Sequence, residues 1–165
     1  MERDLLIFDA SAIIFSKSIW KYIHQEFTII VSPLIKDESG VSDGLEVVDL
    51  NDKDKEFVAR TLHSEFSKHS ATNYKKGKVP KNAGEIEALA LARRFHKPIV
   101  YHDNIVRRLA KARNIQSISL VDLPDRIDNI PKEDLIDFYK KLCRMRSSEK
   151  ACQKITELMN ERTNS

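Results

Sequence analysis

The sequence predicts an α/β protein with a doubly wound, mainly parallel five-stranded sheet that carries helices on both faces. Two observations lead to this prediction. Short apolar runs alternate with helical patterns, and each run is continuously apolar, as in strands that are covered on both sides. The predicted strands are residues 5–8, 27–31, 45–48, 98–101 and 118–121.

Helical patterns connect these strands. Apolar residues at helical spacing predict one helix within residues 12–25, between the first two strands. Asn51 or Asp52 can cap the next helix, because short polar side chains accept hydrogen bonds from its first turn. Two later helices are expected, the first from Glu85 to before Pro98, the second from a cap at Asp103 or Asn104 to a left-handed Asn114.

The pattern changes after Pro131. We expect an α/β domain in residues 1–130 and an extension of one or two amphipathic helices in residues 131–165, with a break at Ser147–Ser148. The apolar face of the extension would pack on the sheet domain or form a homodimer. Its two cysteines, Cys143 and Cys152, are nine residues apart, which fits neither one helical face nor a zinc pattern and favours reduced, packed thiols.

Composition indicates an ordinary soluble domain. Of its 165 residues, 41% are hydrophobic and 32% are charged, a balance that allows a sizeable core. No apolar run approaches the roughly 20 residues that span a bilayer, and the charged residues 2–4 precede only a short apolar run, unlike a signal peptide. We therefore expect a cytoplasmic protein without a membrane partner.

Acidic residues stand at the same structural place in two of the predicted strands. Asp9 ends the first apolar run, residues 5–8, and Asp103 ends the later apolar run that starts at Pro98. The carboxyl ends of parallel strands face one crevice, and Glu38 and Glu85 are expected to join the two aspartates there. Four carboxylates repel one another unless a divalent cation lies among them, so the sequence predicts a metal site.

Basic residues flank these acids, although the net charge is only +3. The stretch 74–81 precedes Glu85, and a basic helix follows Asp103. Such groups beside an acidic cleft favour a phosphate-backbone substrate, with Tyr74 able to stack on a base, whereas a solvated charged surface is the alternative for each stretch alone. The residues expected to contact phosphates are Lys75, Lys76, Lys78, Lys81, Arg107 and Arg108.

Four motifs in this order resemble those of the PIN domain family. They are Leu6-Ile7-Phe8-Asp9-Ala10-Ser11, then Ile30-Val31-Ser32-Pro33 with Glu38, then Gly84-Glu85-Ile86-Glu87-Ala88, and last Val100-Tyr101-His102-Asp103. The third is similar to the form found in one prokaryotic branch. The match covers about residues 5–122, but His102 stands where that branch often has an Asp, and Asn104 replaces the usual basic residue.

The resemblance implies a divalent-metal-dependent endoribonuclease that hydrolyses phosphodiester bonds of RNA, as in the toxins of toxin–antitoxin pairs, whose partner is an antitoxin protein. It makes Asp9, Glu85 and Asp103 the main ligands of Mg²⁺ or Mn²⁺, which prefer hard oxygen donors. Glu38 would bind a second ion or orient water, and Ser11 would hydrogen-bond a ligand. Asp122, His102 and Asn104 are expected at the rim.

Each assignment has an alternative. Asp103 can be only a helix cap, Asp37 offers the same chemistry as Glu38, and Glu87 competes with Glu85 but should point about 200° away around the helix. Haloacid-dehalogenase-like phosphatases need Asp-x-Asp after the first strand, and receiver domains need a lysine after the last; the chain has neither, nor a P-loop. The remaining functional alternative is a PIN-like module that binds RNA or protein without cutting.

Overall fold

The computed structural model describes residues 3–145 and 148–163 and confirms the predicted fold class. Its five strands form one all-parallel sheet in the order β3-β2-β1-β4-β5. They are β1 (Asp4–Phe8), β2 (Phe27–Val31), β3 (Leu45–Val47), β4 (Ile99–Tyr101) and β5 (Ser117–Ser119). The last strand is shorter than predicted, because a 3₁₀ helix that contains Pro124, η2 (Leu120–Arg126), replaces its second half.

The central strand β1 lies between β2 and β4, and its residues Ile7 and Phe8 are fully buried. Ile7 pairs with Ile30 on one side and with Ile99 on the other. From β1 the chain adds β2 and β3 in one direction, then returns to add β4 and β5 in the other, so the strand order reverses between β1 and β4. In open α/β sheets, the crevice outside the carboxyl ends of the strands at such a point is where ligands bind.

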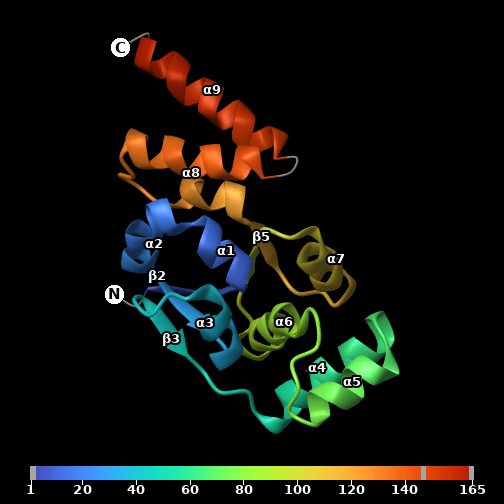
Figure 1. Cartoon of the computed structure of the whole chain (residues 1–165). Helices are drawn as coiled ribbons and strands as arrows, with labels where there is room; N and C mark the ends of the chain where they lie inside the picture. The colour runs from blue at the N-terminus through green and yellow to red at the C-terminus, as the bar shows by residue number, and fades with distance from the viewer. Residues whose placement is uncertain (1–2, 146–147, 164–165) are drawn as a thin grey trace.

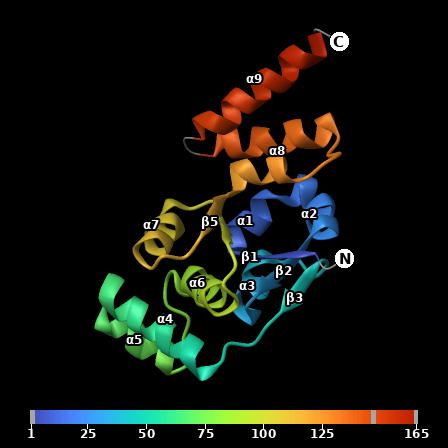
Figure 2. The same ribbon diagram turned by 180° about the vertical axis from the view of Figure 1, so that it is seen from behind.

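Helices cover both faces of the sheet (Figures 1 and 2). The connections α1 (Ala10–Phe15), η1 (Lys17–Ile19), α2 (Trp20–Glu26) and α3 (Pro33–Ser39) lie on one face, and α6 (Ala83–Phe95) and α7 (Asn104–Ala112) lie on the other. The pair α4 (Asp52–Glu65) and α5 (Lys68–Lys75) packs outside α6. This arrangement leaves the carboxyl ends of β1 and β4 bordered by α1, α6 and α7.

Two helical predictions need correction. The single helix expected in residues 12–25 is divided into α1, η1 and α2, because α1 ends at Ser16, whose hydroxyl donates to the carbonyl of Ile13 at 2.9 Å and competes with helix continuation. The helix α5 was not predicted, and it includes Tyr74 and Lys75 of the expected basic loop. Ser67 starts this helix by accepting a hydrogen bond from the Ser70 amide.

The predicted helix caps and the left-handed Asn114 are confirmed. Asn51 caps α4 by accepting from the Asp54 amide, and the Asp54 side chain accepts a hydrogen bond from the Asn51 backbone N–H, which completes a capping box. Asp103 caps α7, and Asn114 follows that helix in the left-handed conformation with a φ of 55°.

The extension consists of α8 (Lys132–Arg144) and α9 (Glu149–Thr163). Phe138 and Leu142 of α8 are fully buried and belong to the main core, where α8 packs on α1, η1 and η2. The apolar face of α8 therefore packs on the same chain, one of the two outcomes expected, while a homodimer stays a prediction. Ser148 lies between the two helices, and Ser147 lies outside the described residues.

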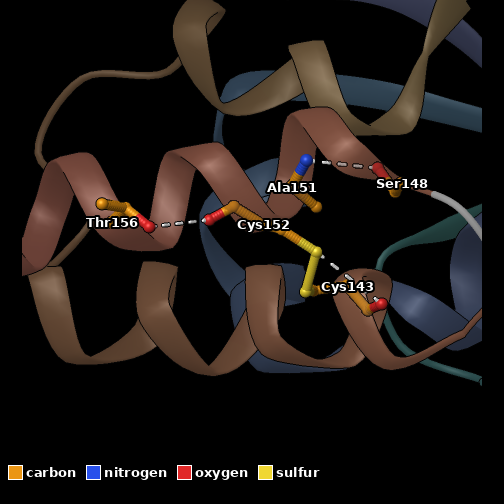
Figure 3. Close-up of a disulfide and its surroundings, with 5 residues drawn as sticks. All are labelled: Cys143, Ser148, Ala151, Cys152 and Thr156. Atoms are coloured by element: carbon orange, nitrogen blue, oxygen red, sulfur yellow. Dashed lines mark hydrogen bonds between the residues drawn. A yellow bond between two sulfur atoms is a disulfide. The ribbon is translucent and has the colours of Figure 1, made fainter.

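A disulfide joins Cys143 and Cys152, so the prediction of reduced thiols is contradicted (Figure 3). Cys143 lies in the last turn of α8 and Cys152 in the first turns of α9, and their Cα atoms are 5.0 Å apart. A spacing of nine residues separates two side chains on one continuous helix. Here the two cysteines lie on different helices and face each other where these helices pack. Within the described ranges, no helix is both long and apolar enough to cross a membrane.

Candidate functional site

Asp9 is the most buried of the predicted site residues, with 1% of its surface exposed. It follows β1 directly, and its backbone N–H donates to the carbonyl of Val100 in β4 at 3.4 Å. Its Oδ1 caps α1 by accepting from the Ala12 amide at 2.7 Å and from the Ser11 hydroxyl at 3.1 Å. Among the described residues, nothing donates a hydrogen bond to Oδ2, although that oxygen is buried.

The protonation of Asp9 reflects this environment. Burial raises the pKa of its carboxyl from 3.8 to about 7, against the opposing effect of the hydrogen bonds from Ala12 and Ser11. The negative charges of Glu85 and Asp103 raise the pKa further. A buried carboxylate that lacks a partner is unstable in its charged form, so this oxygen favours either a proton or a cation.

Asp103 is exposed and lies two residues beyond β4. Its Oδ1 accepts a hydrogen bond from the Ile105 amide at 3.2 Å, which caps α7. The cap that was considered as an alternative role is thus present. It does not exclude a role in the site, because the charge of Asp103 acts on Asp9.

Glu38 and Glu85 approach from two other helices. Glu85 is half-buried in the first turn of α6, and Glu38 lies near the end of α3. The Glu38 carboxyl packs against Gly84, where an added Cβ would lie 2.7 Å from Oε2 and would push this flexible carboxyl aside. Partial burial raises the pKa of Glu38, and the charges of Glu85 and Glu87 raise it further. Asp37 and Glu38 are both exposed, but these contacts favour Glu38 as the site residue.

Glu87 lies nearer to this group than its place on the helix predicted, since its charge reaches Glu38. It is buried, and its Oε2 accepts a hydrogen bond from the Tyr74 hydroxyl at 2.8 Å. Burial and this hydrogen bond raise the pKa of Tyr74. Tyr74 is therefore held by α6 and packs on the core, and the expectation that it stacks on a base is not supported.

The main evidence that these residues suit a metal ion comes from Asp9. In residues 3–145 and 148–163, no group of three or more His, Cys, Asp or Glu side chains is already placed to hold an ion. Carboxylates without a counter-charge repel one another, so they are not expected to close up by themselves. The buried, unpaired Oδ2 of Asp9 is the observation that fits a cation, because Glu85 and Asp103 act on the same carboxyl.

A groove of about 1040 Å³ has Asp103, one of these acids, in its lining. We call it the Arg107 groove. It also contains Ser11 and all three residues expected at the rim, His102, Asn104 and Asp122. The His102 ring packs on Phe15 with a centroid distance of 4.6 Å, and burial lowers the pKa of this histidine while the charge of Asp103 opposes that change. Asp122 forms an ion pair with Lys150 of α9.

The predicted phosphate-binding residues fall into three groups. Lys75, Lys76, Lys78 and Lys81 are exposed at the end of α5 and in the loop before α6. Arg107 lines the groove. Arg108 instead pairs with Glu65 of α4 at 3.3 Å, beside a second pair from Arg113 at 3.0 Å, so it also has a structural partner.

The groove residues that the sequence did not predict include an aromatic side chain and two cations: Phe15, Arg126 and Lys150. Phe15 lies within the apolar helical pattern of residues 12–25 and carries no further signal. Arg126 and Lys150 carry no local signal, because they reach the groove only through the packing of η2 and the extension against the sheet domain.

Comparisons with known proteins do not identify a family. No family model matches the chain, and no curated protein is similar enough in sequence to count as a relative. The resemblance to PIN domains thus depends on the four motifs alone, and function has to be argued from the site.

Proposed function

We propose that this protein is a divalent-metal-dependent endoribonuclease that hydrolyses phosphodiester bonds of RNA, with a PIN-like site. The observation that supports it most is the unpaired, buried Oδ2 of Asp9 at the point where the strand order reverses. A helix cap needs only the other oxygen of this carboxyl. The free oxygen, with Glu85 and Asp103 acting on it, is what a metal site requires and what a structural cap does not.

In this proposal Asp9, Glu85 and Asp103 hold one Mg²⁺ or Mn²⁺ ion, and Glu38 holds a second ion or orients water. Bound ions of this kind activate water and stabilise charge on a phosphate during in-line displacement. The protein's own contribution is positional: Ala12 and Ser11 fix one oxygen of Asp9, and so orient the other. The exposed lysines before α6 neutralise phosphates of the substrate.

The test is cleavage of a single-stranded RNA by the full chain, with and without added Mg²⁺ or Mn²⁺. We expect cleavage that depends on the metal and stops on addition of a chelator. Glu38→Gln should reduce it, whereas Asp37→Asn, which removes the neighbouring exposed carboxylate, should not. Metal-independent cleavage, or equal effects of the two changes, would contradict the proposed site.

RNA binding without any cleavage would favour the alternative, a PIN-like module that holds RNA or a partner protein. The unpaired carboxylate oxygen of Asp9 argues against it, since a binding module has no use for a buried acid near neutral pKa. An antitoxin partner, a homodimer and a cytoplasmic location stay predictions. A small DNA-binding protein encoded by a neighbouring gene would support the first of these.

A further inference from the structure

One wall of the Arg107 groove comes from outside the predicted catalytic domain. Met145 and Ser148, at the junction of α8 and α9, and Lys150, in the first turn of α9, line the groove together with Arg126 of η2. Asp103 and Arg107 of the candidate site line the same groove. The extension therefore borders the same opening as Asp103.

This wall is fixed in place by several contacts. Lys150 pairs with Asp122 of η2, and Lys154 of α9 lies 3.6 Å from Asp125. The disulfide between Cys143 and Cys152 ties the two ends of the helix junction together (Figure 3). The disulfide thus links α9 to α8, and the two ion pairs link α9 to η2.

The groove also offers aromatic surface. The rings of Phe15 and His102 pack on each other at a tilt of 52°, and both line the groove. Phe15 and His102 are half-buried, so part of each ring faces the opening. Stacking on aromatic rings is the usual way in which proteins hold unpaired bases, because every base has a π-face.

Three cations line the same groove as this aromatic pair. They are Arg107, Arg126 and Lys150, and two carboxylates, Asp103 and Asp122, line it as well. Arg107 and Arg126 come from different elements, α7 and η2. Cations that flank an aromatic surface match a nucleotide, whose phosphate and base are presented together.

We propose that the Arg107 groove binds the nucleotide next to the scissile phosphate of a single-stranded RNA. Its base packs on Phe15 and His102, and its phosphate is neutralised by Arg107 and Arg126. This inference rests on the proposed ribonuclease function. It makes the α8–α9 junction part of the substrate-binding surface, so this junction helps to determine which RNA is cut.

Binding is measured first without cleavage, by fluorescence anisotropy of a labelled single-stranded RNA with the full chain in chelator. The double variant Arg107→Ala with Arg126→Ala should weaken binding and flatten its dependence on salt by about 0.7 in the logarithmic slope, since each phosphate neutralised on a single strand contributes about 0.7. The matched control is Lys53→Ala with Arg60→Ala on α4, which removes the same charge away from the groove and should leave the slope nearly unchanged. Equal effects of the two double variants would overturn the proposal.

Base contact is measured with 2-aminopurine placed along the same RNA. Its fluorescence should fall on binding at one position, and Phe15→Leu should weaken affinity by about tenfold and remove that quenching. The conservative His102→Phe should keep it. An RNA that lacks the base at this position should bind the parent and Phe15→Leu equally. Quenching that survives Phe15→Leu would place the base elsewhere.

The two proposals fail in different ways. Metal-dependent cleavage with RNA affinity unaffected by every groove variant would sink the groove assignment and leave the ribonuclease in place. Groove-dependent binding with no cleavage under any metal would leave a nucleotide-binding groove and remove the ribonuclease. Unaffected RNA affinity together with binding of peptides to the groove would assign this surface to a protein partner.

Discussion

Asp9 and Asp103 occupy equivalent positions and have different surroundings. Each follows one of the two neighbouring central strands, and each caps the next helix through its Oδ1. Asp103 is exposed, so water can satisfy its second oxygen. Asp9 is buried, and its second oxygen has no hydrogen-bond donor among the described residues. The same local motif is therefore complete at one strand end and leaves an unpaired oxygen at the other.

The difference shows where local structure stops explaining a residue. A buried acid without a partner lowers stability, and an asparagine or serine could cap α1 without that cost. The excess carboxylate oxygen of Asp9 is explained if the site is built to hold a cation. Four changes test this comparison, from the largest expected effect to the smallest.

The largest expected effect is on RNA cleavage by variants of Asp9 and Asp103. Asp9→Asn and Asp103→Asn should each reduce metal-dependent RNA cleavage by about 100-fold or more, since loss of groups that only support metal ligands already costs about 10- to 100-fold. Both substitutions keep an oxygen that can cap the helix. Cleavage rates at saturating metal provide the measurement. If Asp103→Asn retained the parent's rate, Asp103 would be a cap alone and the two strand ends would differ in function.

Stability without metal should depend on pH through Asp9. Its folded-state pKa of about 7 exceeds the ordinary value of 3.8, so the unfolded chain releases this proton first and stability falls as pH rises from about 4 to 7. The difference corresponds to roughly 4 kcal/mol. Asp9→Asn should remove most of this dependence in denaturant titrations with chelator, and Asp103→Asn should leave it almost intact. A pH-independent parent would contradict the burial argument.

Bound metal should restore the stability that is lost as pH rises. An ion that binds only the folded chain adds about 2.7 kcal/mol of stability at 100 times its dissociation constant. Melting temperatures in Mg²⁺ or Mn²⁺ should rise for the parent, more at about pH 8 than at about pH 5, since binding requires deprotonated acids. Asp9→Asn should show little response to either ion. Equal stabilisation of parent and variant would indicate that the ion binds elsewhere.

The stability that each helix cap contributes should be the smallest of these effects, and it should be similar for Asp9 and Asp103. Comparison of Asp→Ala with Asp→Asn isolates it, because only alanine removes the accepting oxygen. We expect alanine to cost about 1 kcal/mol more than asparagine at each position. Chemical denaturation at about pH 4 measures the difference, because the stability loss that accompanies ionisation of Asp9 has barely begun there. A much larger loss at Asp103 would reveal a structural network there beyond the cap.

The sequence allowed the sheet to be predicted almost residue by residue, since each strand is a short apolar run between turn signals. The helix caps at Asn51 and Asp103 and the left-handed Asn114 were also local signals. The helix break at Ser16 and the helix α5 after Ser67 were not predicted, because the apolar patterns of these segments are too short to distinguish from their surroundings.

The site was predictable only where it depends on topology. That Asp9 and Asp103 influence each other follows from adjacent parallel strands. The position of Glu38 against Gly84, the hydrogen bond from Tyr74 to Glu87 and the approach of Lys150 depend on how separate helices pack, which no short segment encodes. The disulfide was missed for the same reason.

The pairing of β1 with β4 has a consequence for folding kinetics. Phe8 pairs with Val100, and two strands and several helices separate them along the chain. Closing such a long loop costs chain entropy, so we expect Asp9 to join Asp103 late in folding. An interaction absent from the transition state slows unfolding and leaves the folding rate unchanged. We therefore expect bound metal to lower the unfolding rate alone in stopped-flow experiments. An acceleration of folding would mean that the ion gathers the acids before the sheet is complete.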